Sequence, residues 1–180
     1  HFANARLTRA ANIDALTQIP NRGSFDQRLA EEWQRARRAH HSISLVMIDV
    51  DHFKKYNDTY GHIFGDKLLT ACAKRLQDTV GKNDFIGRLG GDEFVLIFAG
   101  LTDGTAVQDL CLRIIKAIEV PIPFEDHMCR ISCSMGIFPV FGSYVDPRDI
   151  LLNADVALYQ AKHDGRGRCH IFEPTKISDR

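Results

Sequence analysis

The sequence lacks three features that would place it in other classes of protein. No apolar run approaches the length of a membrane span and no signal peptide is visible, so we expect no membrane contact by this domain. Charge of one sign is not in excess, because 23 Lys and Arg residues balance 23 Asp and Glu residues. Without a basic field, the chain is not expected to bind nucleic acid. Its 180 residues suit one domain with a substantial core.

The chain has five cysteines, an odd number, and their spacing is not that of zinc ligands. Cys129 and Cys133 are expected on one face of a single strand, packed in the core as thiols. A reducing cytoplasm is therefore the expected location. The chain begins at His1 rather than Met. We expect it to be a piece of a longer protein, either multidomain or membrane-anchored.

What the sequence contains is an alternation of helix and strand patterns without internal repeats. Helices packed on a mixed sheet give an α/β or α+β domain. The expected helices cover residues 1–13, 25–36, 52–58, 66–80, 107–118 and 151–161, with a turn at 61–66. The expected strands cover residues 43–49, 85–89, 94–98, 128–138 and 169–172.

The most informative run extends from Gly90 to Phe94, where two glycines precede the adjacent carboxylates of Asp92 and Glu93. Apolar runs on both sides make this a hairpin, because glycine adopts positive φ at little steric cost. Without a Cβ on Gly90 or Gly91, the phosphates of a ligand can approach the turn closely. The alternative is an ordinary hairpin with a solvated acidic tip.

A second carboxylate pair follows the apolar run from Ser44 to Ile48, which is typical of a strand buried on both faces. Asp49 and Asp51 stand where this strand leaves the sheet. Ligands of open α/β sheets bind outside such strand ends, and Mg²⁺ takes one or two carboxylates beside substrate phosphates. The alternative is solvated charge at a strand end. For Asp49 the metal-site interpretation is favoured over solvated charge, and for Asp51 the two interpretations are equally favoured.

Together these runs resemble the GGDEF family of bacterial diguanylate cyclases, from about Asp14 to the end of the chain. The resemblance implies a ferredoxin-like palm related to nucleotidyl cyclases, with a central mixed sheet of about five strands. It implies a catalytic domain over residues 14–180 and a connector helix over residues 1–13 that arrives from an absent upstream regulatory domain. The matching runs are 14–17, 20–22, 46–54, 57–58, 61–62, 65–66, 88–94, 154–162 and 165–166.

The family reaction joins two GTP molecules into cyclic di-GMP and releases two pyrophosphates, with one GTP held by each protomer of a homodimer. By resemblance, the side chains of Asp49 and Glu93 and the carbonyl of Val50 bind metal. Asp92 is either a further metal ligand or the base for the 3′-hydroxyl. The implied cofactor is Mg²⁺ or Mn²⁺, two ions per active site, which would neutralise developing charge.

The resemblance to the family implies that Asp66 and Asn57 recognise guanine. One carboxylate accepts both the N1–H and N2–H donors of guanine, and adenine would leave it unpaired. The alternative for Asp66 is a helix cap, or both roles together. Members of the family with serine at this position form mixed purine products, so the aspartate favours GTP alone.

The resemblance to the family implies that Lys54, Lys162 and Arg166 bind phosphate. The last two are expected one turn apart on one helix face, where both can reach a triphosphate. The alternative is a solvated basic helix end, which the helix dipole favours. Phe53 is expected to pack beside the phosphate loop, and His62 to line the pocket without a catalytic role.

Two other functions remain as alternatives to an active cyclase. One is a catalytically inactive sensor of GTP or cyclic di-GMP, which usually has a damaged signature and keeps an arginine that binds product. The other is a dimerising module without a nucleotide role. The intact Asp49, Asp92 and Glu93 favour the active enzyme.

Product inhibition is expected to be weak or absent. The family's inhibitory motif is Arg-x-x-Asp, and this chain has Asp84 but carries Gly81 in place of the arginine. The guanidinium that would stack on guanine and pair with phosphate is missing, and Lys82 is displaced and differs in geometry. Calorimetric titration with cyclic di-GMP should show no tight binding. Tight binding that Asp84→Ala abolishes would contradict this expectation.

Overall fold

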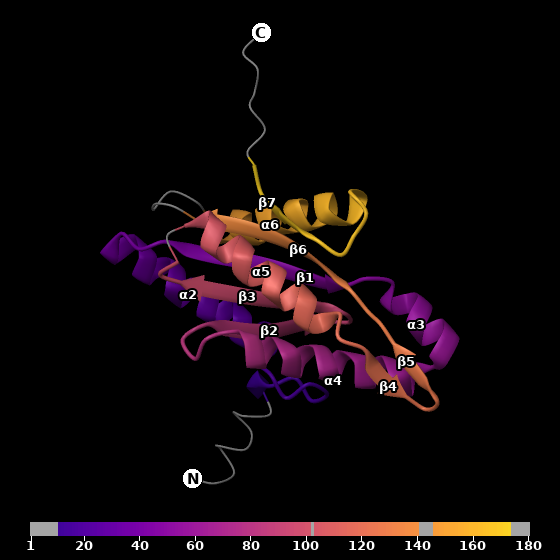
Figure 1. The fold of residues 1–180 in the computed structure, drawn as a ribbon. Helices are drawn as coiled ribbons and strands as arrows, with labels where there is room; N and C mark the ends of the chain where they lie inside the picture. The colour runs from indigo at the N-terminus through magenta and orange to yellow at the C-terminus, as the bar shows by residue number, and fades with distance from the viewer. Residues whose placement is uncertain (1–10, 102, 141–145, 174–180) are drawn as a thin grey trace, which may run out of the picture.

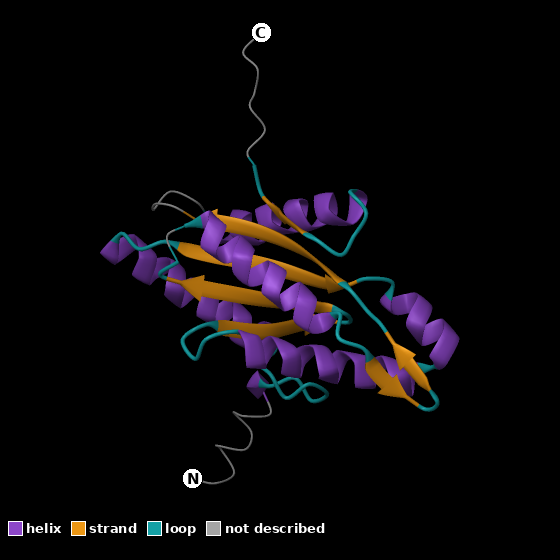
Figure 2. Ribbon diagram, in the orientation of Figure 1, coloured by secondary structure: helices purple, strands orange, loops and turns teal. Residues whose placement is uncertain are grey.

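The computed structural model describes residues 11–101, 103–140 and 146–173, and in them five strands form one mixed sheet (Figures 1 and 2). The strand order is β2-β3-β1-β6-β7; β6 and β7 run parallel, whereas the other neighbours are antiparallel. This confirms the predicted α+β class. The main strands are β1 (Ile43–Val50), β2 (Phe85–Gly90), β3 (Glu93–Ala99), β6 (Cys133–Val140) and β7 (Cys169–Ile171). The helices are α2 (Arg22–Ala39), α3 (Phe53–Tyr60), α4 (His62–Thr79), α5 (Gly104–Ile118) and α6 (Pro147–His163), and a small ribbon joins β4 (Ile122–Phe124) to β5 (His127–Cys129).

Strand β1 lies at the centre of the sheet and is buried along its whole length. Successive side chains of a strand point to opposite faces, so an uninterrupted apolar run fills two cores. Val46 and Ile48 pack on one face with side chains of α4 and α5. Leu45 and Met47 pack on the other face with side chains of α2 and α6. The sheet is thus covered by two helices on each side.

Helix α6 lies unusually close to β6 because Gly136 has no side chain. A Cβ at Gly136 would stand 2.1 Å from the carbonyl oxygen of Ala154 and 2.2 Å from the amide nitrogen of Leu158. Asp146 caps the start of the helix by accepting from the amide of Arg148 at 2.8 Å. This close packing brings the last turn of α6, which contains Lys162, to the end of β1.

The prediction of one long strand over residues 128–138 is wrong. Two strands, β5 and β6, replace it, and residues 130–132 leave the ladder between them. The reason is that β5 pairs with β4 whereas β6 pairs with β1, and between them Tyr56 Oη donates to the carbonyl of Arg130 at 2.7 Å. Cys129 and Cys133 are buried free thiols, as predicted, but they belong to different strands.

The predicted start of helix α4 is wrong. Helix α4 begins at His62, with Gly61 before it, so the predicted turn over residues 61–66 is already helical and Asp66 does not cap the helix. Gly61 serves as the boundary at φ 85°, which ends α3 and opens α4 without a break. Of the predicted connector helix, residues 1–10 lie outside the described residues, and residues 11 and 12 are helical.

Candidate active site

The acidic hairpin and the end of β1 lie side by side. Asp49 is the direct antiparallel partner of Glu93, and side chains of directly opposed residues share one face of the sheet. The amide of Val50 donates to the carbonyl of Asp92 at 3.2 Å. Gly90 and Gly91 adopt φ of 142° and 51°, as predicted for a turn that favours glycine. Residues distant in sequence thus bring several carboxylates to one edge.

Asp49 is a buried carboxylate that lies between another carboxylate and an ammonium group. It is 7% exposed, and its burial together with the neighbouring carboxylate of Asp92 raises its pKa from 3.8 to about 7. The ammonium of Lys162 forms an ion pair with Asp49 Oδ2, which opposes that rise. Asp49 Oδ1 is buried and has no hydrogen-bond partner. Lys162 therefore compensates only part of the negative charge at this strand end.

These donors fit a divalent cation of the hard type. Carboxylate oxygens are the ligands that Mg²⁺ prefers, and the ion usually takes only one or two of them beside phosphate and water oxygens. The unpartnered Asp49 Oδ1 and the adjacent Asp92 offer such oxygens. Within residues 11–101, 103–140 and 146–173, no cluster of three or more His, Cys, Asp or Glu side chains is arranged to hold a metal. A metal here would need further ligands from its substrate or from solvent.

Arg88 braces the glycine turn against the start of the chain. Its Nε and Nη2 donate to the carbonyl of Gly91 at 3.1 and 2.8 Å, and its Nη1 lies 3.0 Å from Asp14 Oδ2. Asp14 in turn accepts from the amide and the hydroxyl of Thr17, at 2.8 and 2.6 Å. Sequence reasoning missed this brace, because the partners are 74 residues apart and no local pattern connects them.

The candidate guanine residues lie on two adjoining helices. The side chain of Asn57 on α3 lies against Gly65 on α4: a Cβ at Gly65 would stand 1.8 Å from Asn57 Oδ1 and 3.3 Å from Cζ of Phe53. Asn57 Oδ1 is buried and has no hydrogen-bond partner, whereas Asp66, the neighbour of Gly65, is exposed. An amide oxygen without a hydrogen-bond partner thus lies against Gly65, the residue before an exposed carboxylate.

The other candidate residues of this region differ in exposure. Phe53 is partly buried and packs against the core on the α4 side of the sheet. The side chains of Lys54 and His62 are exposed at the beginnings of α3 and α4. Both helix starts therefore carry basic or titratable groups at the surface.

Arg166 is not on a helix face with Lys162, so that prediction is wrong. Helix α6 ends at His163, and the amide of Arg166 donates back to the carbonyl of Ala161 at 3.1 Å, which closes the helix end. Arg166 itself has φ of 63°, an uncommon conformation for a residue with a side chain. It belongs to a turn that leads from α6 to β7.

Asp51 is not a solvated charge. It is 2% exposed, and it accepts from Ser132 Oγ at 2.5 Å, from Ser134 Oγ at 2.6 Å and from the amide of Gly167 at 2.9 Å. These donors lie 81 or more residues away in sequence. The strand-end alternative could therefore not be decided from the local pattern.

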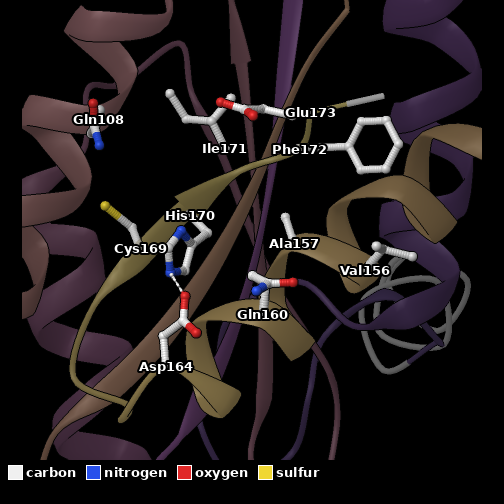
Figure 3. Close-up of a pocket in the computed structure, with 10 residues that line it drawn as sticks. All are labelled: Gln108, Val156, Ala157, Gln160, Asp164, Cys169, His170, Ile171, Phe172 and Glu173. Atoms are coloured by element: carbon white, nitrogen blue, oxygen red, sulfur yellow. Dashed lines mark ion pairs between the residues drawn. The ribbon is translucent and has the colours of Figure 1, made fainter. Parts of the chain in front are cut away.

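A cavity of about 1120 Å³ lies elsewhere, between α5, α6 and the edge strand β7 (Figure 3). His170 and Asp164 point toward one another in it, with Nε2 and Oδ2 2.9 Å apart. None of the predicted site residues lines this cavity, so it is separate from the candidate active site. Its lining residues are Gln108, Val156, Ala157, Gln160, Asp164, Cys169, His170, Ile171, Phe172 and Glu173.

No helix in the described part of the chain is long and apolar enough to cross a membrane.

Comparison with known proteins gives consistent matches over almost the whole chain. The family model described as "Diguanylate cyclase, GGDEF domain" matches residues 11–168. The bifunctional diguanylate cyclase/cyclic di-GMP phosphodiesterase MucR of Pseudomonas aeruginosa is 39% identical over 95% of this chain and 25% of its own length. Diguanylate cyclase DgcS of Shewanella oneidensis is 36% identical over 96% of this chain and 56% of its own length.

Solved structures agree with these sequence matches. The coiled coil and GGDEF domain of DgcB from Caulobacter crescentus, crystallised in complex with c-di-GMP, superposes with a TM-score of 0.87 at 28% identity. That match covers 94% of this chain and 90% of the other. This chain spans only 21 to 25% of the length of three of its similar curated relatives.

The repulsion between Asp49 and Asp92 predicts a pH-dependent gain in stability on neutralising Asp92. A folded-state pKa of Asp49 near 7, above its unfolded value, means that its contribution to stability is largest at low pH and is lost as pH rises through 7. Without metal, Asp92→Asn should raise the free energy of unfolding by about 1 kcal/mol at pH 8 and by much less at pH 5. Urea unfolding in EDTA measures both values.

The matched control for that substitution is Asp78→Asn, which neutralises a 65% exposed side chain on α4. It should change the stability little at either pH. An Asp92→Asn variant that is less stable than the parent chain at pH 8 without metal would contradict the proposed repulsion.

Proposed function

We propose that this chain, which belongs to the GGDEF domain family of diguanylate cyclases, condenses two GTP molecules into cyclic di-GMP and releases two pyrophosphates. The observation that carries the proposal is the buried Asp49 beside Asp92, with one oxygen unpartnered and the other in an ion pair with Lys162. Such a strand end favours a metal-bound polyphosphate. In each half reaction a 3′-oxygen bonds to the α-phosphorus of the opposite GTP, and the bond to pyrophosphate breaks.

Members of the family generally use a divalent metal, and here we propose Mg²⁺ or Mn²⁺, two ions per site. Asp49, Glu93 and the Val50 carbonyl would hold them, and Asp92 would be a further ligand or the base that takes the proton of the 3′-hydroxyl. When bound, the metal lowers the pKa of that hydroxyl and neutralises the developing charge. The unpartnered Asp49 Oδ1 supports this assignment.

Asn57 and Asp66 are proposed to read the guanine edge. Asp66 is exposed and would accept from N1–H and N2–H, while the unpartnered amide oxygen of Asn57 would accept a further donor. An adenine base lacks the matching donors, so GTP is the favoured substrate.

Lys54, Lys162 and Arg166 are proposed to hold the phosphates beside the open turn of Gly90 and Gly91. Lys162 is the best supported, because its ammonium already lies at the Asp49 carboxylate. A cation bound at Asp49 would compete with this ion pair and leave the ammonium available to a phosphate oxygen. Since each protomer would hold one GTP, the reaction requires a homodimer in which two sites face each other.

Incubation with GTP and Mg²⁺ over a range of protein concentrations tests the proposed activity. The parent chain should form cyclic di-GMP, and the specific activity should rise with protein concentration if dimerisation limits the rate. Glu93→Ala should form none. Bound GTP without product at any concentration would contradict the proposal and favour a nucleotide sensor.

The substitution Gly65→Ala is expected to lower the affinity for GTP without changing the charge of the protein. The added Cβ would overlap Asn57 Oδ1, so the amide must leave its position. We expect at least about a tenfold weaker affinity for 3′-deoxy-GTP, which cannot cyclise, as the loss of one or two hydrogen bonds would give. Calorimetric titration in Mg²⁺ provides the measurement.

Gly23→Ala is the matched control, because its Cβ would meet only Asn21 Oδ1 at 3.4 Å in helix α2. It should leave the affinity unchanged. Equal affinity of Gly65→Ala and the parent chain would show that Asn57 does not contact the base.

A further inference from the structure

We propose that Asp51 is a positioning residue that holds Arg166 toward the triphosphate. The inference rests on the proposed function and extends it to a residue that touches neither metal nor nucleotide. Asp51 would act through the turn over residues 165–168, which connects α6 to β7.

The turn that carries Arg166 has a backbone conformation that needs support. Gly165, Arg166 and Gly167 have φ of 116°, 63° and 59°, three consecutive residues in the left-handed half of conformational space. A residue with a side chain in such a conformation persists only where the surroundings fix it. Arg166 is the member of the three that cannot adopt it freely.

Asp51 supplies the central support of this turn. Its Oδ2 accepts from the amide of Gly167 at 2.9 Å, directly after Arg166, and from Ser132 Oγ at 2.5 Å. Oδ1 accepts from Ser134 Oγ at 2.6 Å. Because these donors stabilise a charged carboxylate, Asp51 tolerates an exposure of only 2%. One buried side chain thus joins the turn to both strands β1 and β6.

The two ends of the turn are held by other bonds. The amide of Arg166 donates to the carbonyl of Ala161 at 3.1 Å, and the amide of Met135 donates to the carbonyl of Arg168 at 2.9 Å. Between these points the amide of Gly167 donates to Asp51 Oδ2, and Arg168 Nε donates to the carbonyl of Arg166 at 3.1 Å. Because the bond from Arg168 lies within the turn itself, we expect the bond from outside the turn, to Asp51, to set the direction in which Arg166 leaves it.

The position of Asp51 also links the turn to the candidate metal ligands. Asp51 directly follows β1, and its Oδ1 accepts from Ser134, the direct partner of Asp49 on β6, so both carboxylates lie on the same side of the sheet. Asp49 holds Lys162 and Asp51 holds the turn of Arg166. The strand end thereby fixes the spacing between the metal ligands and two phosphate-binding cations.

A double-substitution cycle tests this role, with binding of 3′-deoxy-GTP in Mg²⁺ as the measurement. Asp51→Asn should weaken binding about tenfold in the parent chain, because Arg166 is no longer held toward the phosphates. In the Arg166→Ala background the same substitution should weaken binding less than about twofold. A merely structural role would give the same loss in both backgrounds.

A milder variant covers the case in which Asp51→Asn does not fold. Ser132→Ala removes one donor to Asp51 and keeps the bond to Gly167. It should weaken binding about threefold, again only when Arg166 is present. Ser42→Ala, which removes a comparable hydroxyl bond to Leu101 far from this turn, is the control and should have no effect.

The outcomes distinguish a failure of the proposed role of Asp51 from a failure of the proposed function. Equal losses in both backgrounds, or no loss from either Asp51→Asn or Ser132→Ala while the parent chain binds, would overturn the role of Asp51 and leave the proposed function in place. A parent chain that does not bind 3′-deoxy-GTP would overturn the proposed function, and the role of Asp51 with it.

Discussion

The buried end of strand β1 imposes the constraint on which the rest of the structure depends. Two carboxylates, Asp49 and Asp51, leave water there and need compensation, because an unpaired buried charge is costly. Asp51 is fully satisfied by two hydroxyls and an amide, whereas Asp49 keeps an unpartnered oxygen and a raised pKa. Asp51 therefore connects parts of the protein, whereas Asp49 is available to a ligand.

The fold around this strand end follows from patterns that can be read locally. The apolar run before Asp49 predicts a central strand, and the two glycines at 90 and 91 predict the hairpin. Predictions failed where distant groups decide the backbone. The break at residues 130–132 lies where the chain passes from pairing with β4 to pairing with β1, and the turn of Arg166 is bonded to the distant Asp51, so neither has a local signal.

The residues of the candidate site could be proposed from the sequence, but the contacts among them could not. The resemblance assigns Asp49, Asp92 and Lys162 to one site, and the structure brings these three together. The contact of Asn57 with Gly65 and the brace from Arg88 to Asp14 need the fold, since they connect separate elements. Residues that support the site are therefore the ones that a sequence pattern reveals least.

Anomalous diffraction from crystals grown with Mn²⁺ and 3′-deoxy-GTP would test the central claim most directly. We predict a Mn²⁺ peak between Asp49 and Glu93, with the ammonium of Lys162 moved from Asp49 to a phosphate oxygen. A nucleotide bound elsewhere, or a Lys162 that remains paired with Asp49 and no metal peak at the strand end, would contradict it.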